Sequence, residues 1–246
     1  MKVEEFEYSV DGTVYLGYLA YEEGEVGKKL PGVLVAHAWR GLDEFAKDKA
    51  KALAKLGYVG FAIDLYGDGK FAESDAEAAA LMKPLFIERK ELRKRIVGAY
   101  KVLQDHTAVD EHKIGAIGFC FGGLAAIELL RSGVDLRGGV VSFHGVLGNH
   151  LGALRAELEP SDSPLNGALL LLHGYKDPLV SSEDLENIQK EFTDANVDWQ
   201  LNVFGRASHA FTNPDAQDEG SGLIYNAGAE RRSLKAMENF LSEQFS

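Results

Sequence analysis

The chain has 246 residues, of which 46% are hydrophobic and 26% charged, and its formal net charge is −12. This composition is typical of a soluble globular protein with a sizeable core, and the length suits a single domain spanning residues 1–246. The negative charge argues against nucleic acid and anionic membrane surfaces as partners, because both are negatively charged themselves.

Two further features concern location. No apolar run approaches the roughly 18 residues that a membrane span needs, and the opening stretch MKVEEFEYSV lacks the apolar core of a secretory signal. Cys120 is the single cysteine and has no internal partner for a disulfide. We therefore expect a cytoplasmic protein with a free thiol.

Apolar runs that alternate with helical patterns predict the elements in chain order. The strands are expected at residues 3–9, 13–20, 33–36, 59–67, 113–119, 138–145, 168–174 and 199–204. The helices are expected at residues 44–56, 74–105, 122–132, 181–195 and 229–243. Asp11 and Gly12 form a hairpin-type turn, Gly57 is a C-cap, and Pro84 is expected to break the second helix.

This alternation predicts a mostly parallel sheet with helices on both faces and an antiparallel N-terminal hairpin. Ligands bind such sheets outside the carboxyl ends of the strands. Candidate site residues should therefore lie in the loops 37–43, 64–72, 118–123, 145–150, 174–180 and 205–213. Residues 66–95 are expected to cap the site.

The stretch IGFCFGGLA joins a predicted strand to a predicted helix, and Cys120 lies at the join. A nucleophile at such a corner adopts a strained backbone, and the sharp turn requires small residues two positions away on either side, here Gly118 and Gly122. The following helix favours a thiolate, and the amide of Phe121 would face an oxyanion. The alternative is a small buried cysteine packed beside a glycine turn.

A thiol nucleophile needs a base and a group that orients the base. Asp177 follows the strand in ALLLLHG, and His209 lies in FGRASHAF, in the loop after the last strand. The chain order nucleophile, acid, histidine predicts that Cys120, Asp177 and His209 form a catalytic triad. Taken singly, Asp177 could be an ordinary turn residue before Pro178, and His209 a surface-loop histidine.

Three other histidines lie near strand ends. His37 is interpreted as a strand-end hydrogen-bonding residue, and His173 as packing or bonding beneath Asp177. Together with His144 they lack the spacing of a known metal site, so we expect no metal.

The loop HAWRGLDEF is expected to supply a second oxyanion donor, the amide of Trp39, with Ala38 as the neighbouring alternative. Arg40, Tyr66 and Phe211 are predicted to contact the substrate. Aromatic residues of the motif loops line an apolar pocket in this interpretation, or else belong to the core: Trp39, Tyr66, Phe119, Phe121, Phe143 and Phe211.

Together these features resemble the dienelactone hydrolase family of the α/β-hydrolase superfamily. The similarity rests on the N-terminal hairpin and on the motifs AHAWRG, FAIDLYG, GFCFGG, HGYKDPLV and SHAF, which span nearly the whole chain. The resemblance implies the α/β-hydrolase fold and a Cys–His–Asp triad that hydrolyses esters or lactones without a metal or organic cofactor. It assigns Cys120 as nucleophile, His209 as base and Asp177 as orienting acid.

Two positions depart from the family pattern. The best-known members carry a glutamate that contacts the resting thiol, where this chain has Ala38. They also bind a substrate carboxylate with arginines, one of them four positions after the catalytic histidine, where this chain has Asn213. Direct deprotonation by His209 is therefore expected, and dienelactone itself is a doubtful substrate. Arg40 and Arg206 remain candidates for a positive charge near the site.

A thiolate expels an alkoxide poorly, because the thiol is the better leaving group from the tetrahedral intermediate. We therefore expect activated esters, such as aryl esters, enol esters or enol lactones, with aryl phosphotriesters as an alternative. Other cysteine enzymes, such as thiol peptidases, use a similar elbow without the acid-then-histidine tail. A non-enzymatic redox sensor is a further alternative, although it has no second cysteine to resolve a sulfenate. A monomer or a homodimer is expected.

Overall fold

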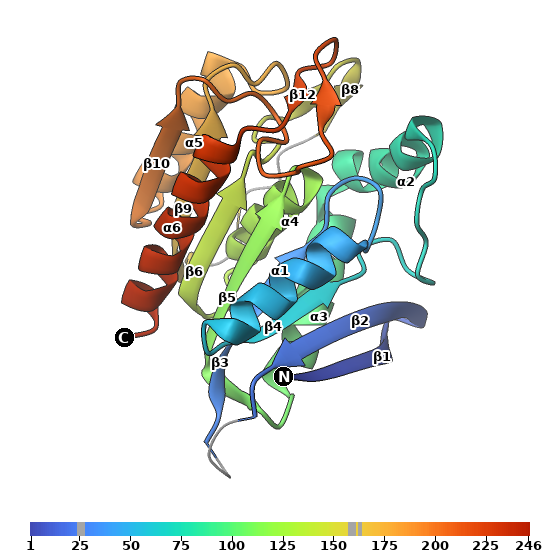
Figure 1. Cartoon of the computed structure of the whole chain (residues 1–246), viewed down its shortest axis with the longest axis vertical. Coiled ribbons are helices and arrows are strands. Elements are labelled where there is room, and N and C mark those ends of the chain that lie inside the picture. Colours follow the sequence, from blue (N-terminus) through green and yellow to red (C-terminus); the bar gives the residue numbers. More distant parts are fainter. Residues whose placement is uncertain (24–27, 157–160, 162–163) are drawn as a thin grey trace.

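The computed structural model describes residues 1–23, 28–156, 161 and 164–246. Its centre is an eight-stranded sheet with the spatial order β1-β2-β4-β3-β5-β6-β9-β10 (Figure 1). The strands are β1 (Lys2–Val10), β2 (Thr13–Tyr21), β3 (Leu30–Ala36), β4 (Val59–Ile63), β5 (Val109–Phe119), β6 (Leu136–Phe143), β9 (Gly167–Gly174) and β10 (Trp199–Phe204). All eight predicted strands are present, because their apolar runs are long enough to be recognised from the sequence.

The N-terminal strands form the antiparallel edge of the sheet. β1 pairs with β2 through a two-residue turn, in which Asp11 (φ 49°) and Gly12 (φ 81°) take the left-handed conformation that such turns require. β2 also pairs antiparallel with β4, and the remaining pairs of the sheet are parallel. The parallel strands therefore end at one common edge, where ligands bind in sheets of this kind.

Helices cover both faces of the sheet, with α1 and α6 on one face and α2, α3, α4 and α5 on the other. Their bounds are α1 (Glu44–Lys55), α2 (Asp75–Ile87), α3 (Arg89–Gln104), α4 (Phe121–Arg131), α5 (Ser182–Asp194) and α6 (Ala227–Gln244). Side chains that accept a backbone amide cap the N-termini of α1, α2, α5 and α6, and these caps are Asp43, Ser74, Ser181 and Asn226.

The expected break at Pro84 is wrong. α2 continues through Pro84 to Ile87, and the interruption comes at Glu88, whose ψ of 75° is not helical. The side chain of Arg89 is buried there and donates to the carbonyl of Gly148 at 3.1 Å, which fixes the turn between α2 and α3. Tertiary packing thus outweighs the roughly 3 kcal/mol that an internal proline costs a helix.

Two short hairpins were not predicted, because each strand has only two residues. β7 (His150–Leu151) pairs with β8 (Leu154–Arg155), and β11 (Gln217–Asp218) pairs with β12 (Leu223–Ile224). The second hairpin lies in the loop that follows β10, above the carboxyl edge of the sheet (Figure 1). Within the described ranges, none of the helices has the length and apolar character to cross a membrane.

Candidate active site

Cys120 occupies the corner between β5 and α4. Its φ of 55° lies in the left-handed region, which is strained for a residue with a side chain, and its amide donates to the carbonyl of Phe143 at 3.1 Å. A side chain at Gly118 would collide with the backbone of Gly122, and one at Gly122 with the carbonyls that end β3. Both glycines are therefore required by the close passage of chain segments around the corner.

His209 and Asp177 meet although they lie 32 residues apart. Nδ1 of His209 is 2.8 Å from Oδ2 of Asp177, and both side chains are fully buried. The other oxygen of Asp177 accepts a hydrogen bond from the amide of Leu179 at 2.9 Å, so both oxygens of the carboxylate are fixed. This contact fixes the ring of His209 with Nδ1 as the donor and leaves Nε2 as the second ring nitrogen.

The charge on His209 depends on its neighbours. Burial disfavours the imidazolium, but the negative charge of an ionised Cys120 and the hydrogen bond to Asp177 outweigh it and raise the pKa of His209 to about 10. Within the described part of the chain, Nε2 of His209 makes no hydrogen bond of ordinary geometry. The thiol is thus close enough to act on the ring electrostatically, while Nε2 stays available to a reacting group.

The loop that carries His209 is fixed by its own hairpin. The His209 amide donates to the carbonyl of Gly222 at 3.1 Å, and the Ile224 amide donates to the carbonyl of His209 at 3.0 Å. The Ser208 hydroxyl lies 3.0 Å from the Lys176 carbonyl and 2.6 Å from that of Gly222. The segments that carry the acid and the histidine are thereby tied together.

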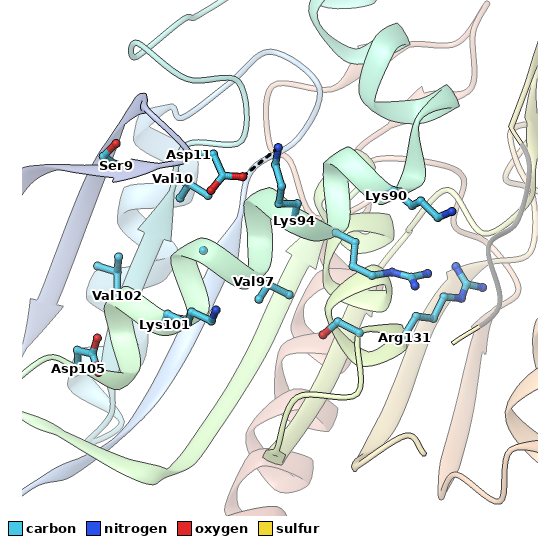
Figure 2. Close-up of a pocket in the computed structure, with 13 residues that line it drawn as sticks. Ser9, Val10, Asp11, Lys90, Lys94, Val97, Lys101, Val102, Asp105 and Arg131 are labelled. Carbon is cyan, nitrogen blue, oxygen red and sulfur yellow. Dashed lines mark ion pairs between the residues drawn. The ribbon is translucent and has the colours of Figure 1, made fainter. Parts of the chain in front are cut away.

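A cavity of about 270 Å³ opens at this edge of the sheet, and both Cys120 and His209 line it. Its walls come from the loop after β3, the start of α1 and the segment 210–223. Of the segment 66–95, which was expected to cap the site, only Asp75 lines this cavity. A larger surface hollow of about 740 Å³ lies elsewhere, between the β1–β2 turn and α3 (Figure 2), and contains none of the predicted site residues.

Of the three residues predicted to contact the substrate, only Arg40 lines the cavity, whereas Tyr66 and Phe211 do not. Arg40 lines the cavity and forms an ion pair with Asp75. Phe211 is fully buried and packs against His144 and Phe204, so its assignment to the pocket is corrected to the core. An aromatic residue next to a site histidine can face either side of its loop, and the sequence does not distinguish the two.

Tyr66 also requires a correction, because it does not line the cavity. Its hydroxyl donates to the carbonyl of Trp39 at 2.6 Å, and its ring stacks near that of Phe121. Tyr66 is therefore placed to support the loop after β3. Phe119 and Trp39 line the cavity, whereas Phe121 and Phe143 are buried in the core.

Two buried polar side chains hold the loops around the site. His37 contacts the carbonyl of Ala38 through Nδ1, and its Nε2 accepts the amide of Leu65 at 3.1 Å, which agrees with the expected strand-end role. Asp64 accepts the amides of Tyr66 at 2.8 Å and of Gly67 at 2.9 Å. Hydrogen bonds with these two buried side chains thus fix the backbone of the loops after β3 and β4.

His144 lines the cavity and was missed as a site residue. Its Nε2 is 2.8 Å from the hydroxyl of Thr212, and its ring packs edge-to-face with that of His209 at 5.2 Å between centroids. Burial and the neighbouring His209 hold the pKa of His144 well below its usual value, so this ring is neutral. Its place directly after the buried strand β6 was the available signal.

The remaining predictions concern positive charge and metal. Arg206 is exposed and lines a different hollow, near the start of α6, so it places no charge in the cavity. His173 is buried, and no hydrogen bond joins it to Asp177 within the described residues. Among the described residues, no group of three or more His, Cys, Asp and Glu side chains is arranged to hold a metal ion.

A largely parallel sheet with helices on both faces and a strained strand-to-helix corner after β5 defines an α/β-hydrolase fold. The model of the dienelactone hydrolase family matches residues 16–245, and the chain therefore belongs to this family.

The similar proteins agree with this assignment. A probable 2-oxo-3-(5-oxofuran-2-ylidene)propanoate lactonase of Bradyrhizobium sp is 31% identical over 204 residues, which cover 82% of this chain and 80% of that protein. A solved structure named m3DLH is 38% identical with a TM-score of 0.90, and covers 100% of this chain and 99% of its own. A dienelactone hydrolase-like promiscuous phosphotriesterase from metagenomic libraries is 35% identical with a TM-score of 0.88 and the same coverage. The chain is accordingly a dienelactone hydrolase-like hydrolase.

Proposed function

We propose that the protein hydrolyses activated carboxylic esters or lactones through Cys120, with His209 as the base and Asp177 as the residue that orients it. The observation that carries the proposal is the shared cavity: Cys120 at the strained corner and His209, held by Asp177 at 2.8 Å, line the same space. Nucleophile, base and orienting acid are the three parts that covalent catalysis of this kind needs.

In the proposed reaction, His209 holds the proton of the Cys120 thiol, in keeping with its raised pKa, and the thiolate attacks the carbonyl carbon of the substrate. The tetrahedral intermediate collapses to an acyl-thioester and releases the alcohol, which takes a proton from His209. His209 then removes a proton from a water molecule that attacks the thioester. The carbon–sulfur bond breaks, the acid leaves, and the Cys120 thiolate is regenerated beside the protonated His209. Ala38 stands where related enzymes carry a glutamate, so we assign deprotonation to His209 directly.

Two backbone amides are proposed as the oxyanion hole. Trp39 lines the cavity, and Phe121 is the first residue of α4, where helix amides have no partner within the helix. Among the described residues, the amides of Trp39 and Phe121 donate no hydrogen bond to another backbone carbonyl. By comparison with known oxyanion holes, each donor would contribute about 2.7–4 kcal/mol to the transition state.

The substrate class follows from the nucleophile. A thiolate is a better leaving group than an alkoxide, so an unactivated alkyl ester returns to the starting state more often than it reacts. Aryl esters, enol esters and enol lactones release a more acidic alcohol and avoid this return. Aryl phosphotriesters are a second candidate class, favoured by the 35% identity to a promiscuous phosphotriesterase.

The proposal is tested with p-nitrophenyl acetate and with an aryl phosphotriester. Cys120→Ala should abolish turnover of both while the melting temperature changes little, and Cys120→Ser should retain weak activity. His209→Gln should also lower kcat by a factor of about 10³ or more, whereas His112→Gln, which changes an exposed histidine, should leave kcat unaltered.

The intermediate offers a second measurement. Mass spectrometry of acid-quenched reactions should show one acyl group on Cys120 of the wild type and none on Cys120→Ala. Turnover that persists in Cys120→Ala would show that another residue is the nucleophile. Rapid alkylation of Cys120 without any turnover would instead favour a thiol sensor.

A further inference from the structure

The walls of the active-site cavity carry an excess of negative charge. Among the described residues, four carboxylates line it, from Asp43, Asp75, Asp215 and Asp218, and Arg40 is the one arginine or lysine in the lining. Arg40 forms an ion pair with Asp75, which cancels one carboxylate and leaves three. A pocket lined mostly by charges of one sign attracts ligands of the opposite charge.

Two other cations near the cavity do not offset this charge. His209 lines the cavity and carries a charge at neutral pH, but the ionised Cys120 and Asp177 that raise its pKa to about 10 balance that charge. Lys49 lies behind the aromatic rings of the wall, 4.6 Å from the centroid of Phe45 and 5.9 Å from that of Phe119, and it pairs with Glu230 at 3.5 Å. It does not line the cavity. His144, which does, is neutral because burial and the neighbouring His209 lower its pKa.

Two further features point to a ligand in this space. His209 is fully buried and its Nδ1 is bonded to Asp177, while its Nε2 makes no hydrogen bond of ordinary geometry within the described residues and interacts only with the Cys120 thiol, so this polar atom can still meet a ligand in the cavity. Trp39 and Phe45 add aromatic rings to the lining. Aromatic faces together with carboxylates are the surroundings in which proteins bind ammonium groups.

The three carboxylates that are not paired with Arg40 differ in the hydrogen bonds that they already accept. Asp43 accepts the amide of Ala46 as the N-cap of α1, and Asp218 accepts two amides and the hydroxyl of Ser221 within its own turn. The carboxylate of Asp215 is exposed, and no described residue donates a hydrogen bond to it or pairs with it. Asp215 is thus the acid with the greatest freedom to meet a ligand.

We propose that this cavity selects substrates with a positive charge on the part remote from the scissile bond, such as esters or lactones that carry an ammonium group, over those that carry a carboxylate. Carboxylates from two segments, the start of α1 and the loop after His209, together with the rings of Trp39 and Phe45, supply this preference. The inference deepens the proposed ester hydrolysis, on which it rests, by naming the charge class of the substrate.

The test uses Cys120 as a probe, because it is the only cysteine. Methanethiosulfonate reagents with a trimethylammonium, a neutral or a sulfonate group react with a thiolate, form a disulfide and release methanesulfinate. Their rates on Cys120 are divided by their rates on a free thiol. At about 10 mM ionic strength we expect the cationic reagent to react about tenfold faster than the anionic one, and about 1 M salt should reduce the ratio to within about twofold.

Asp215→Asn should reduce the cation-to-anion ratio by about two- to threefold. Asp198→Asn makes the same charge change on an exposed residue just before β10. Asp198 lies at the amino ends of the parallel strands, away from the cavity, so this substitution should leave the ratio unchanged. Equal normalised rates for the three reagents, a faster anionic reagent, or equal effects of the two variants would overturn the inference.

Ester turnover provides the second arm. We compare p-nitrophenyl esters with acyl chains of equal length that end in trimethylammonium, tert-butyl or carboxylate groups, each corrected for its hydroxide-catalysed rate. The expected order of kcat/KM is cation, neutral, anion. Turnover of the neutral ester tests the proposed function, whereas the thiol-labelling ratio tests the charge preference whether or not any ester reacts.

Discussion

At the scale of single residues, Tyr66 connects the two backbone segments that we assign to the oxyanion hole. Its hydroxyl donates to the Trp39 carbonyl at 2.6 Å, and its ring lies 6.1 Å from that of Phe121, centroid to centroid. Its ring also packs against His37, which binds the loops after β3 and β4. Tyr66 is therefore a positioning residue, although the sequence suggested direct contact with substrate.

Tyr66→Phe removes this hydroxyl and leaves the Trp39 carbonyl without its donor. If the Trp39 amide stabilises the oxyanion, we expect kcat for p-nitrophenyl acetate to fall about tenfold with little change in KM. Tyr100→Phe is the matched control, because the Tyr100 hydroxyl also donates to a backbone carbonyl, that of Asp135 at 3.0 Å, away from the cavity. Equal losses of kcat in both variants would contradict the positioning role.

Residue-scale prediction succeeded where the backbone dictates the residue type. The spacing of Gly118, Cys120 and Gly122 encodes the corner. A residue in the loop after a strand of a parallel sheet must lie at the carboxyl edge, which is where Asp177 after β9 and His209 after β10 are found. It failed for Tyr66 and Phe211, because no local pattern states whether an aromatic ring turns toward a cavity or toward the core.

At the scale of elements, the corner between β5 and α4 depends on how closely α4 approaches the end of β3. Gly122→Ala would gain about 1 kcal/mol of helix propensity, but its Cβ would meet the carbonyls of Ala36 and His37, which are backbone atoms that cannot move aside. We therefore expect a net loss of about 1–3 kcal/mol in the free energy of unfolding.

Chemical denaturation measures this loss, with Gly205→Ala as control. A side chain at Gly205 meets no atom of the described residues within 4 Å, so this substitution should be close to neutral. If Gly122→Ala proved as stable as Gly205→Ala, the close approach of α4 to β3 would not be required for the corner.

Long, periodic elements could be predicted, whereas the hairpin β11–β12 could not. Its two-residue strands are fixed by contacts with distant segments, including Gly222 against Pro178 and the bridge between His209 and Leu223. This hairpin supplies Asp218 and Leu223 to the cavity. The sequence shows each of these acids, but it does not show that they line the same cavity. The net charge of the cavity therefore could not be predicted.

At the scale of the whole molecule, buried histidines couple stability to pH in two directions. Burial lowers the pKa of His37, His144 and His173, so these rings stay neutral in the folded state and gain protons only on unfolding. Their contribution to stability is present above pH 6.5 and is lost as the pH falls below it. His209 has a raised pKa of about 10, and its contribution is present below pH 6.5 and lost as the pH rises through 10.

His173→Gln tests the acid side, because it removes one of these titrations. Below pH 6.5 the unfolding free energy of the wild type should decline more steeply than that of the variant, by at most about 1.4 kcal/mol per pH unit. His112→Gln changes a histidine whose side chain is 72% exposed and should run parallel to the wild type. Parallel curves for His173→Gln would show that the ring of His173 has the same pKa in the folded and unfolded states.

The left-handed backbone at position 120 has a consequence for how such a protein can change. A residue with a side chain held at φ 55° costs the fold about 1–2 kcal/mol that glycine would not. Selection for heat resistance alone would therefore drive this position toward glycine and remove the only thiol of the chain, which is the nucleophile that we propose. At position 120, a gain in folding stability would cost the proposed catalytic activity. Stabilising substitutions must therefore be sought elsewhere in the chain.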